Sequence, residues 1–392
     1  MRKNTNFATC LFYIIVVMNP FFLIILLVHT LINSYIFMRG WQALPASAIC
    51  KILYIVLFVI LYSSLVLSML GRHTLPFGAQ KILYTIGTSW LAWMLYLMMF
   101  FLLTDIVHLL NHFFHFLPDS IGNNPKLFHQ IQVIGGIIIV LTMTSIGYFR
   151  FTNPVVEKIE IQVDKKAGQR KHLRVVAISD VHLGITVDNE RLARYVQLIN
   201  DQKPDVVVIA GDVVDNNPRL MIKRRMYEEL SLIDAPLGVY ACLGNHEYIG
   251  GIEESLDFYA KSKINLLKDE VALVDSSFWI IGRDDRSNHR RKKLSELVSQ
   301  TDSRQVLIML DHQPYNLEQA EENGIDLQFS GHTHNGQLWP ASLIVNKIYE
   351  LGHGFKQKGN TSVYVSSGLA LWGPPFRIGT QSELVVFEIS FE

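Results

Sequence analysis

The sequence predicts an α-helical membrane domain of four transmembrane helices followed by an α/β domain, and two observations carry this prediction. Four uncharged apolar stretches fill the first 150 residues, and short β-branched runs then alternate with amphipathic segments. The density of charged residues changes at the same place. Residues 1–152 hold eight Lys/Arg and two Asp/Glu, and the remaining residues hold 27 basic and 33 acidic side chains. The first part therefore suits lipid and the second suits water. We expect a boundary between domains 1–150 and 151–392.

The four apolar stretches are long enough to cross a membrane. A hydrocarbon core of about 30 Å needs roughly 20 helical residues. The stretches cover, approximately, residues 9–31, 52–70, 82–104 and 127–149. A cleaved signal peptide ending near Ala46-Ser47-Ala48 is the alternative for the first stretch, but the apolar run is too long and ends too far upstream. We expect a multi-pass protein of the inner or plasma membrane.

The distribution of basic residues between the stretches indicates how the chain is oriented in the membrane. Four crossings place both termini on one side of the membrane. With the N-terminus inside, the inner segments carry Arg2, Lys3, Arg72, Lys81, Arg150 and Lys158. The outer loops carry Arg39, Lys51 and Lys126. Because inner loops are normally richer in Lys and Arg, we expect the second domain to be cytoplasmic.

The second domain repeats one unit, in which a short apolar run ends in a polar cluster. A strand is expected at 156–163 and a helix at 189–200, with Leu192, Val196 and Ile199 on one face. Buried strands are expected to end at Ile178 and to span 206–210, 239–243, 306–310 and 326–330. The alternation predicts an α/β domain with its site at the strand ends.

Five of these strand ends deliver metal-ligand side chains. The blocks are Asp180-Val181-His182, Gly211-Asp212, Gly244-Asn245-His246-Glu247, His312 and Gly331-His332-Thr333-His334. A single Asp or His after a strand is more often a cap or turn residue, but five in series favour a metal site. Carboxylate, imidazole and amide donors without thiolate suit Mn, Fe or Zn, and the three cysteines have no metal or redox spacing.

The five blocks resemble the calcineurin-like metallophosphoesterase superfamily, whose pattern is D-x-H, G-D, G-N-H-[DE], H and G-H-x-H. The resemblance covers roughly residues 156–392. The motifs at 331–337 and 372–379 are most similar to the membrane-associated phosphohydrolases of the YkuE/YaeI type, which usually have Gly at the position of Asn335. The resemblance implies a β-sandwich flanked by helices.

The resemblance also implies two divalent metal ions (Mn, Fe or Zn) and their ligands. The first ion is expected to be bound by Asp180, His182 and His334. The second is expected to be bound by Asn245, His312 and His332. Asp212 bridges both ions, and His246 contacts the scissile phosphate or protonates the leaving group. Glu247 or Asp215 is expected to orient His246 or a ligand, and Asp215 is equally well interpreted as a helix N-cap.

The implied function is a membrane-anchored phosphoesterase in which a metal-activated hydroxide hydrolyses a phosphodiester or pyrophosphate bond. The expected partners are the bilayer and a phosphorylated small-molecule or lipid substrate, because tethering concentrates the enzyme at the membrane. The mildly acidic second domain argues against nucleic acid. The alternative is a non-catalytic membrane scaffold or sensor, although such modules typically lose ligands and none is missing here.

Two further clusters leave alternatives open. The first follows the third apolar stretch at near-helical spacing and comprises Asp105, His108, His112 and His115. It is interpreted either as a metal or proton site or as the end of a helix at the membrane interface. A basic cluster comprises Arg283, Arg286, His289, Arg290, Arg291, Lys292 and Lys293. It is either a solvated loop or a contact for anionic head groups or a second phosphate.

Overall fold

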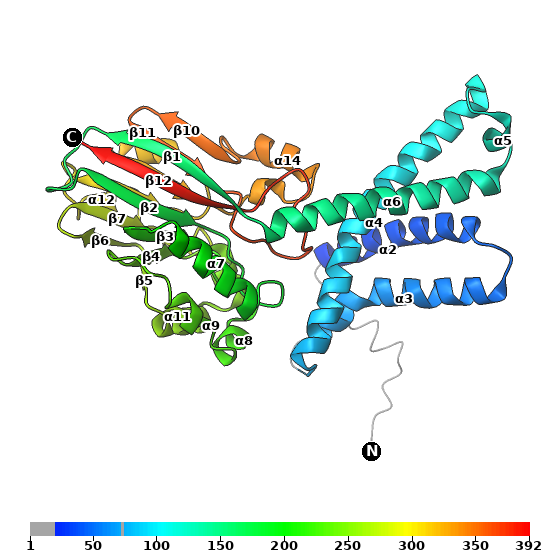
Figure 1. The fold of residues 1–392 in the computed structure, drawn as a ribbon, viewed down its shortest axis with the longest axis horizontal. Coiled ribbons are helices and arrows are strands. Elements are labelled where there is room, and N and C mark those ends of the chain that lie inside the picture. Colours follow the sequence, from blue (N-terminus) through cyan, green and yellow to red (C-terminus); the bar gives the residue numbers. More distant parts are fainter. Residues whose placement is uncertain (1–19, 72–73) are drawn as a thin grey trace, which may run out of the picture. The chain divides into compact units, whose positions relative to one another are not determined.

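The computed structural model describes residues 20–71 and 74–392, which form two compact units that divide between Thr142 and Met143 (Figure 1). Before the first strand, the described helices are α2 (Pro20–Ala43), α3 (Ala48–Leu70), α4 (Phe77–Phe114), α5 (Asp119–Gly122) and α6 (Pro125–Thr152). By length and composition, α3, α4, α6 and residues Leu23–Ala43 of α2 suffice to cross a membrane. The part of the first predicted stretch at 9–19 lies outside the described residues.

Helices α2 and α4 continue well past the ends predicted at residues 31 and 104, and polar side chains beyond those ends pair with each other. Arg39 of α2 forms a salt bridge with Asp105 of α4, and Tyr35 donates a hydrogen bond of 2.6 Å to the same carboxylate. At about 57 Å, the 38-residue α4 is longer than a 30 Å hydrocarbon core. Within the described ranges, no group of three metal-donor side chains includes Asp105 or its neighbouring histidines.

The second unit contains two six-stranded sheets, as the sandwich prediction requires. The first sheet has the order β1-β12-β2-β3-β4-β5 and the second the order β10-β11-β9-β8-β7-β6. The strands of the first sheet are β1 (Val155–Val163), β12 (Glu383–Phe391), β2 (His172–Ile178), β3 (Val206–Ala210), β4 (Val239–Cys242) and β5 (Ile264–Leu266). Those of the second are β10 (Gly354–Lys358), β11 (Thr361–Val365), β9 (Leu327–Ser330), β8 (Val306–Leu310), β7 (Phe278–Gly282) and β6 (Glu270–Val274).

Alternate residues of the central strands fill two different layers, because successive side chains of a strand point to opposite faces. Val175 and Ala177 of β2 pack between the sheets with Ile308 and Leu310 of β8. Val176 belongs to the core on the outer face of the first sheet. Strands β2, β3 and β4 are parallel, as are β7, β8 and β9, so each set ends at one edge of its sheet.

Helices cover the outer faces of both sheets. The first sheet is covered by α7 (Asn189–Asp201), α9 (Met226–Leu230) and α11 (Ile252–Lys261), with α8 (Pro218–Lys223) and α10 (Asn245–Gly250) beside them. The second is covered by α12 (Leu294–Val298) and α13 (Glu318–Glu322), whose apolar residues pack against Leu307 and Met309 of β8. The described structure is completed by α14 (Ala341–Ile348) and the 3₁₀ turn η1 (His334–Gly336).

The last turns of the apolar helix α6 belong to the second unit. Phe151 is buried in the outer core of the first sheet. The carbonyl of Gly147 accepts a hydrogen bond of 2.9 Å from the backbone N–H of Arg377. Gln381 donates to the carbonyl oxygens of Arg150 and Asn153, each at 2.9 Å. The strand β1 then follows directly and pairs in parallel with β12, as Figure 1 shows.

Candidate metal centre

The five predicted strand ends converge on one site. Asp180 and His182 follow β2, Asp212 follows β3, Asn245 follows β4, His312 follows β8, and His332 and His334 follow β9. The two sheets are joined there directly, because His312 Nδ1 lies 2.7 Å from the carbonyl oxygen of Ala210 at the end of β3. That bond also leaves Nε2 of His312 facing the other donors, which is how metal-binding imidazoles are usually oriented.

Asp180, His182 and His334 form the first donor group. His334 Nε2 lies 3.1 Å from His182 Nε2 and 3.3 Å from Asp180 Oδ1, and His182 Nε2 lies 3.8 Å from Asp180 Oδ1. Ligand atoms at about 2.1 Å from one ion are separated by roughly 3.0 Å in octahedral and 3.4 Å in tetrahedral geometry. The donor spacing therefore fits a single divalent ion.

Asp212, His312 and His332 form a second group, with the side-chain oxygen of Asn245 beside them. Asn245 Oδ1 lies 2.8 Å from His332 Nδ1 and 3.1 Å from His312 Nε2. His312 Nε2 in turn lies 3.2 Å from Asp212 Oδ2. These separations again match ligand atoms around one ion.

Asp212 connects the two groups. Its Oδ2 atom lies 3.7 Å from His182 Nε2 in the first group as well as 3.2 Å from His312 Nε2 in the second. A third cluster of donors, made by Asp212, His182 and His246, overlaps both. A carboxylate that faces both groups is the element that two adjacent cations require as a bridge.

The backbone adopts left-handed conformations and approaches neighbouring segments closely where it carries these donors. Asp180, His182, Asp212, His332 and His334 have φ values between 46° and 71°. Such left-handed conformations cost about 1–3 kcal/mol each outside glycine and persist only where the surroundings enforce them. A Cβ atom on Gly331 would overlap the Asp180 carboxylate, and one on Gly244 would overlap that of Asp212. The glycines of the sequence blocks therefore let neighbouring strand ends approach closely.

The electrostatics of most of these side chains suit a metal. Burial and, to a smaller extent, the neighbouring His312 lower the pKa of His332 to about 4. Burial also lowers the pKa of His334, so both imidazoles are neutral at neutral pH, as ligands must be. Burial opposes ionisation of Asp180, yet His334 and His182 hold the pKa of that carboxyl well below its usual range. His312 differs, because Asp212 outweighs the effect of burial and raises its pKa.

His246 lies at the rim of the donor groups. Its ring centroid is 4.6 Å from that of His182 and 6.1 Å from the ring of Trp372. His246 Nδ1 lies 3.0 Å from Asp215 Oδ1. Burial favours the neutral ring, but the Asp215 hydrogen bond and the Asp212 charge raise the pKa of His246 to about 9. Asp215 therefore orients His246, and the N-cap interpretation is wrong because Asn217 caps α8.

Glu247 supports the expected donor Asp212 rather than His246. It is fully buried and accepts backbone N–H bonds from Asp212 and Val214 at 3.1 Å and from Gly244 at 2.7 Å. Burial raises the pKa of this carboxyl, and the nearby Asp212 raises it further. Glu247 thus fixes the turns after β3 and β4 and makes no hydrogen bond to His246 among the contacts of the described residues.

Sequence analysis did not single out Arg377, although it lies inside the motif at 372–379. Its side chain is completely buried and donates to the carbonyl oxygens of His334 and Gly368 at 2.9 and 3.2 Å, and to that of Ala370. Its backbone N–H contacts Gly147 of α6. One residue therefore ties the loop that carries His334 to the end of the membrane helix. An arginine between apolar and glycine residues was the only available sequence signal.

The sequence profile of the calcineurin-like phosphoesterases matches residues 173–336, a segment that contains all seven side chains of the two donor groups. An uncharacterised metallophosphoesterase of Aquifex aeolicus is 31% identical over 241 residues, which cover 60% of this chain and 91% of the relative. A transmembrane protein with metallophosphoesterase domain of Danio rerio is 31% identical over 270 residues (64% and 61%). Metallophosphoesterase YkuE of Bacillus subtilis is 27% identical over 268 residues (62% and 89%). These relatives confirm the predicted resemblance.

Proposed function

Because this chain belongs to the calcineurin-like phosphoesterases and is a metal-dependent phosphoester hydrolase, we propose that it hydrolyses a phosphodiester or pyrophosphate bond in a lipid-linked substrate. The observation that carries the proposal is the pair of buried donor groups that share Asp212. A non-catalytic scaffold or sensor has no need to keep such a set of converging donors, and all seven side chains are present.

In the proposed site, each donor group holds one divalent ion. Asp180, His182 and His334 hold the first. Asn245, His312 and His332 would hold the second, and Asp212 would be shared between the two. When bound, such ions acidify water to a nucleophile and stabilise the charge that develops on the phosphoryl oxygens. Since the ligands include only two carboxylates, the site retains positive charge that attracts the phosphate.

His246 is proposed to protonate the leaving oxygen. Its Nδ1 atom is held by Asp215, which leaves Nε2 as the nitrogen available to the substrate. The raised pKa keeps a proton on the ring at neutral pH, as a general acid requires. Asp215 fixes the ring orientation and stabilises its charge, in the way a carboxylate supports a catalytic histidine elsewhere.

An exposed apolar surface beside the site supports a lipid-linked substrate. Helix α14 exposes Leu343 and Ile344 (62% each) and Ile348 (57%). The preceding Trp339 donates its backbone N–H to Ile378 at 2.8 Å, next to the contact between Arg377 and Gly147 of α6. An amphipathic helix flanked by tryptophan, placed against the end of a membrane-spanning helix, is typical of the membrane interface.

Trp372 connects this apolar surface with the metal centre. It is 51% exposed, its ring faces His246, and its carbonyl oxygen accepts a 3.0 Å bond from Gln337, two residues before Trp339. An acyl or prenyl chain lying along α14 and Trp372 would place an attached phosphate near His246. The arrangement supports a substrate that stays in the bilayer during hydrolysis.

The proposal is tested on the full-length chain in detergent by elemental analysis and hydrolysis of bis-p-nitrophenyl phosphate. We expect two metal equivalents and turnover, lost in Asp212→Asn and kept in Asp201→Asn, which removes a surface carboxylate. Metal-loaded protein without activity on a diester, a pyrophosphate or a monoester would instead support the scaffold or sensor.

The lipid link is tested with a paired substitution on α14. Leu343→Gln with Ile344→Gln is expected to reduce hydrolysis of a phospholipid in vesicles by about tenfold or more, because apolar insertion is lost. The matched control pair, Leu232→Gln with Leu273→Gln, alters exposed leucines away from α14. An equal response of the two pairs would count against an interfacial helix.

The proposed organisation is a membrane domain of residues 1–150 and a catalytic domain of residues 151–392 on the cytoplasmic side of the inner or plasma membrane. The excess of basic residues in the inner segments supports this orientation. Reporter fusions after Lys158 test it, and a signal from the outer side would reverse the placement.

A further inference from the structure

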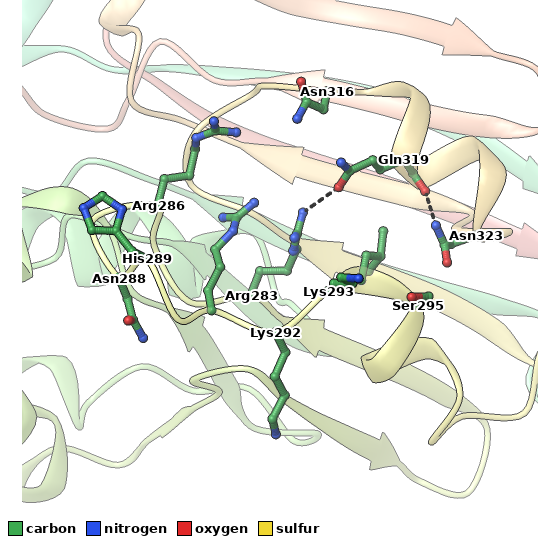
Figure 2. Close-up of a pocket in the computed structure, with 12 residues that line it drawn as sticks. Arg283, Arg286, Asn288, His289, Lys292, Lys293, Ser295, Asn316, Gln319 and Asn323 are labelled. Carbon is green, nitrogen blue, oxygen red and sulfur yellow. Dashed lines mark hydrogen bonds between the residues drawn. The ribbon is translucent and has the colours of Figure 1, made fainter.

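A basic pocket lies on the outer side of the second sheet, beside the metal centre. The cavity of about 510 Å³ lies between residues 283–293, which connect β7 to α12, and the segment that contains α13. Its charged lining includes Arg283, Arg286, Arg291 and Lys293, and its other wall carries Gln319 and Asn323. Figure 2 shows Arg283 reaching across this space to its hydrogen-bond partner Gln319, with Arg286 beside it.

Arg283 gives the pocket a buried and incompletely satisfied donor. The residue is only 5% exposed, and its Nη1 atom donates to Asp311 at 3.0 Å and to Gln319 at 3.3 Å. Its buried Nε atom has no hydrogen-bond partner among the described residues. A buried donor without an acceptor is unfavourable, so the Arg283 guanidinium keeps hydrogen-bonding capacity at the pocket wall that its present partners do not use.

The acidic residues around the pocket do not cancel its charge. The carboxylate of Asp311 is shared by two guanidinium groups, since Arg291 also donates to it at 3.2 and 3.3 Å. Asp269 accepts two backbone N–H groups, Asp284 accepts the Tyr248 hydroxyl, and Asp285 accepts the side-chain amide of Gln313. The pocket lining holds five Lys/Arg, one more than the four carboxylates around it, so a net positive charge remains.

The pocket and the metal centre share the end of β8. Asp311 and the metal donor His312 are consecutive, so their side chains leave the strand end on opposite faces. A second connection runs through two tyrosines: Arg286 lies 4.6 Å over the Tyr315 ring, and the Tyr315 hydroxyl donates to that of Tyr349 at 3.1 Å. The Tyr349 ring centroid is 6.3 Å from that of His332.

We propose that this pocket binds a second phosphate group of the substrate whose scissile phosphate occupies the metal centre. The inference rests on the proposed function and narrows the substrate class to molecules that carry two phosphate groups joined by a spacer. Phosphate matches the pocket because guanidinium groups bind its oxygens in bidentate fashion and lysine adds charge. The spacer would pass Tyr315 and Tyr349, which connect Arg286 of the pocket with His332 of the metal centre.

The proposal is tested with a series of α,ω-alkane bisphosphonates of increasing chain length and a matching alkyl monophosphonate. Binding to metal-loaded, full-length protein in detergent is measured by calorimetry. One chain length should bind at least tenfold more tightly than the monophosphonate, because the second phosphonate binds at high effective concentration. No gain at any chain length would overturn the proposal.

Two charge-matched variants test whether the gain in bisphosphonate affinity arises from the pocket. Arg286→Gln with Lys293→Gln changes two exposed residues of the pocket, and is expected to reduce the ratio of bisphosphonate to monophosphonate affinity to about one. Arg290→Gln with Lys263→Gln removes the same charge outside the pocket lining and should keep the ratio. Retention of the gain in the pocket variant would refute the assignment.

Two further experiments distinguish a second-phosphate site from a lipid head-group site, and the pocket proposal from the proposed function. In nanodiscs, loss of the gain when phosphatidic acid is added would assign the pocket to a membrane-lipid head group and overturn the substrate assignment. An unchanged gain would support it. Hydrolysis of bis-p-nitrophenyl phosphate is measured on the same preparation. A chain-length gain without hydrolysis would refute the proposed function alone, whereas hydrolysis without a gain would refute only the pocket.

Discussion

Replacement of Asp212 by Asn tests the centre of the proposed site, because it removes charge with little change in shape. Asp212 Oδ2 lies 3.2 Å from His312 Nε2 and 3.7 Å from His182 Nε2, so the same carboxylate serves both donor groups. The substitution should therefore weaken both metal sites at once, whereas loss of any other ligand should affect mainly one.

The expected magnitude follows from metal affinity. Loss of a residue that merely supports a ligand costs about 10- to 100-fold in affinity, so loss of the shared ligand should cost at least about 100-fold per ion. Each ion at 100 times its dissociation constant stabilises the fold by about 2.7 kcal/mol, or about 5 kcal/mol for two. For a unit of this size, 1 kcal/mol corresponds to about 2–4 °C, so metal should raise the Tm by about 10–20 °C.

The assay is thermal unfolding of the full-length chain in detergent, with EDTA and then with Mn²⁺ or Zn²⁺. Wild-type protein and the surface control Asp201→Asn should show the full metal-dependent rise. Asp212→Asn should show a rise of only a few degrees. A full rise in Asp212→Asn, together with two retained metal equivalents, would refute the bridging assignment.

Three other predictions address the surroundings of the site. His246→Asn should lower kcat by about 10²- to 10⁴-fold while two metals stay bound, and unchanged turnover would reject the general-acid role. Gly331→Ala should cost about 1–3 kcal/mol in denaturant unfolding and reduce binding of the first metal, because its Cβ would overlap Asp180. Burial favours the neutral form of Glu383, but His353 and the Ser367 N–H outweigh this and lower its pKa below the usual 4.5. Its ionised form should thus stabilise the fold above about pH 4.5 and lose that effect as the pH falls through its folded pKa, so Glu383→Gln should flatten the fall of Tm between about pH 5 and 3.

The sequence was sufficient to single out the candidate metal donors, because each follows a local rule. A buried strand ends, a glycine lets the chain turn closely, and Asp, Asn or His follows. The predicted strand at 206–210 matches β3 residue for residue, and Asp212 follows it at the expected place. Strands of the second sheet such as β10 were not predicted, since β10 has no buried residue and Phe355 is its only large apolar side chain.

Roles that depend on distances between remote segments required the tertiary structure. Asp215 and Glu247 were interchangeable as supports for His246, and only the fold shows that Asp215 contacts the ring while Glu247 binds backbone N–H groups. The salt bridge between Arg39 and Asp105, which accompanies helices longer than the apolar stretches predicted, joins residues 66 positions apart.

The sequence by itself thus determined the apolar stretches, the α/β class and the candidate metal donors, because composition and strand-end motifs are local properties of the chain. The tertiary structure decided how those donors share Asp212, that Arg377 ties the His334 loop to α6, and that segment 283–293 forms a pocket beside β8. These features arise where strands from two sheets and the end of a membrane helix meet. Their physical basis is packing across the chain, which no local pattern encodes.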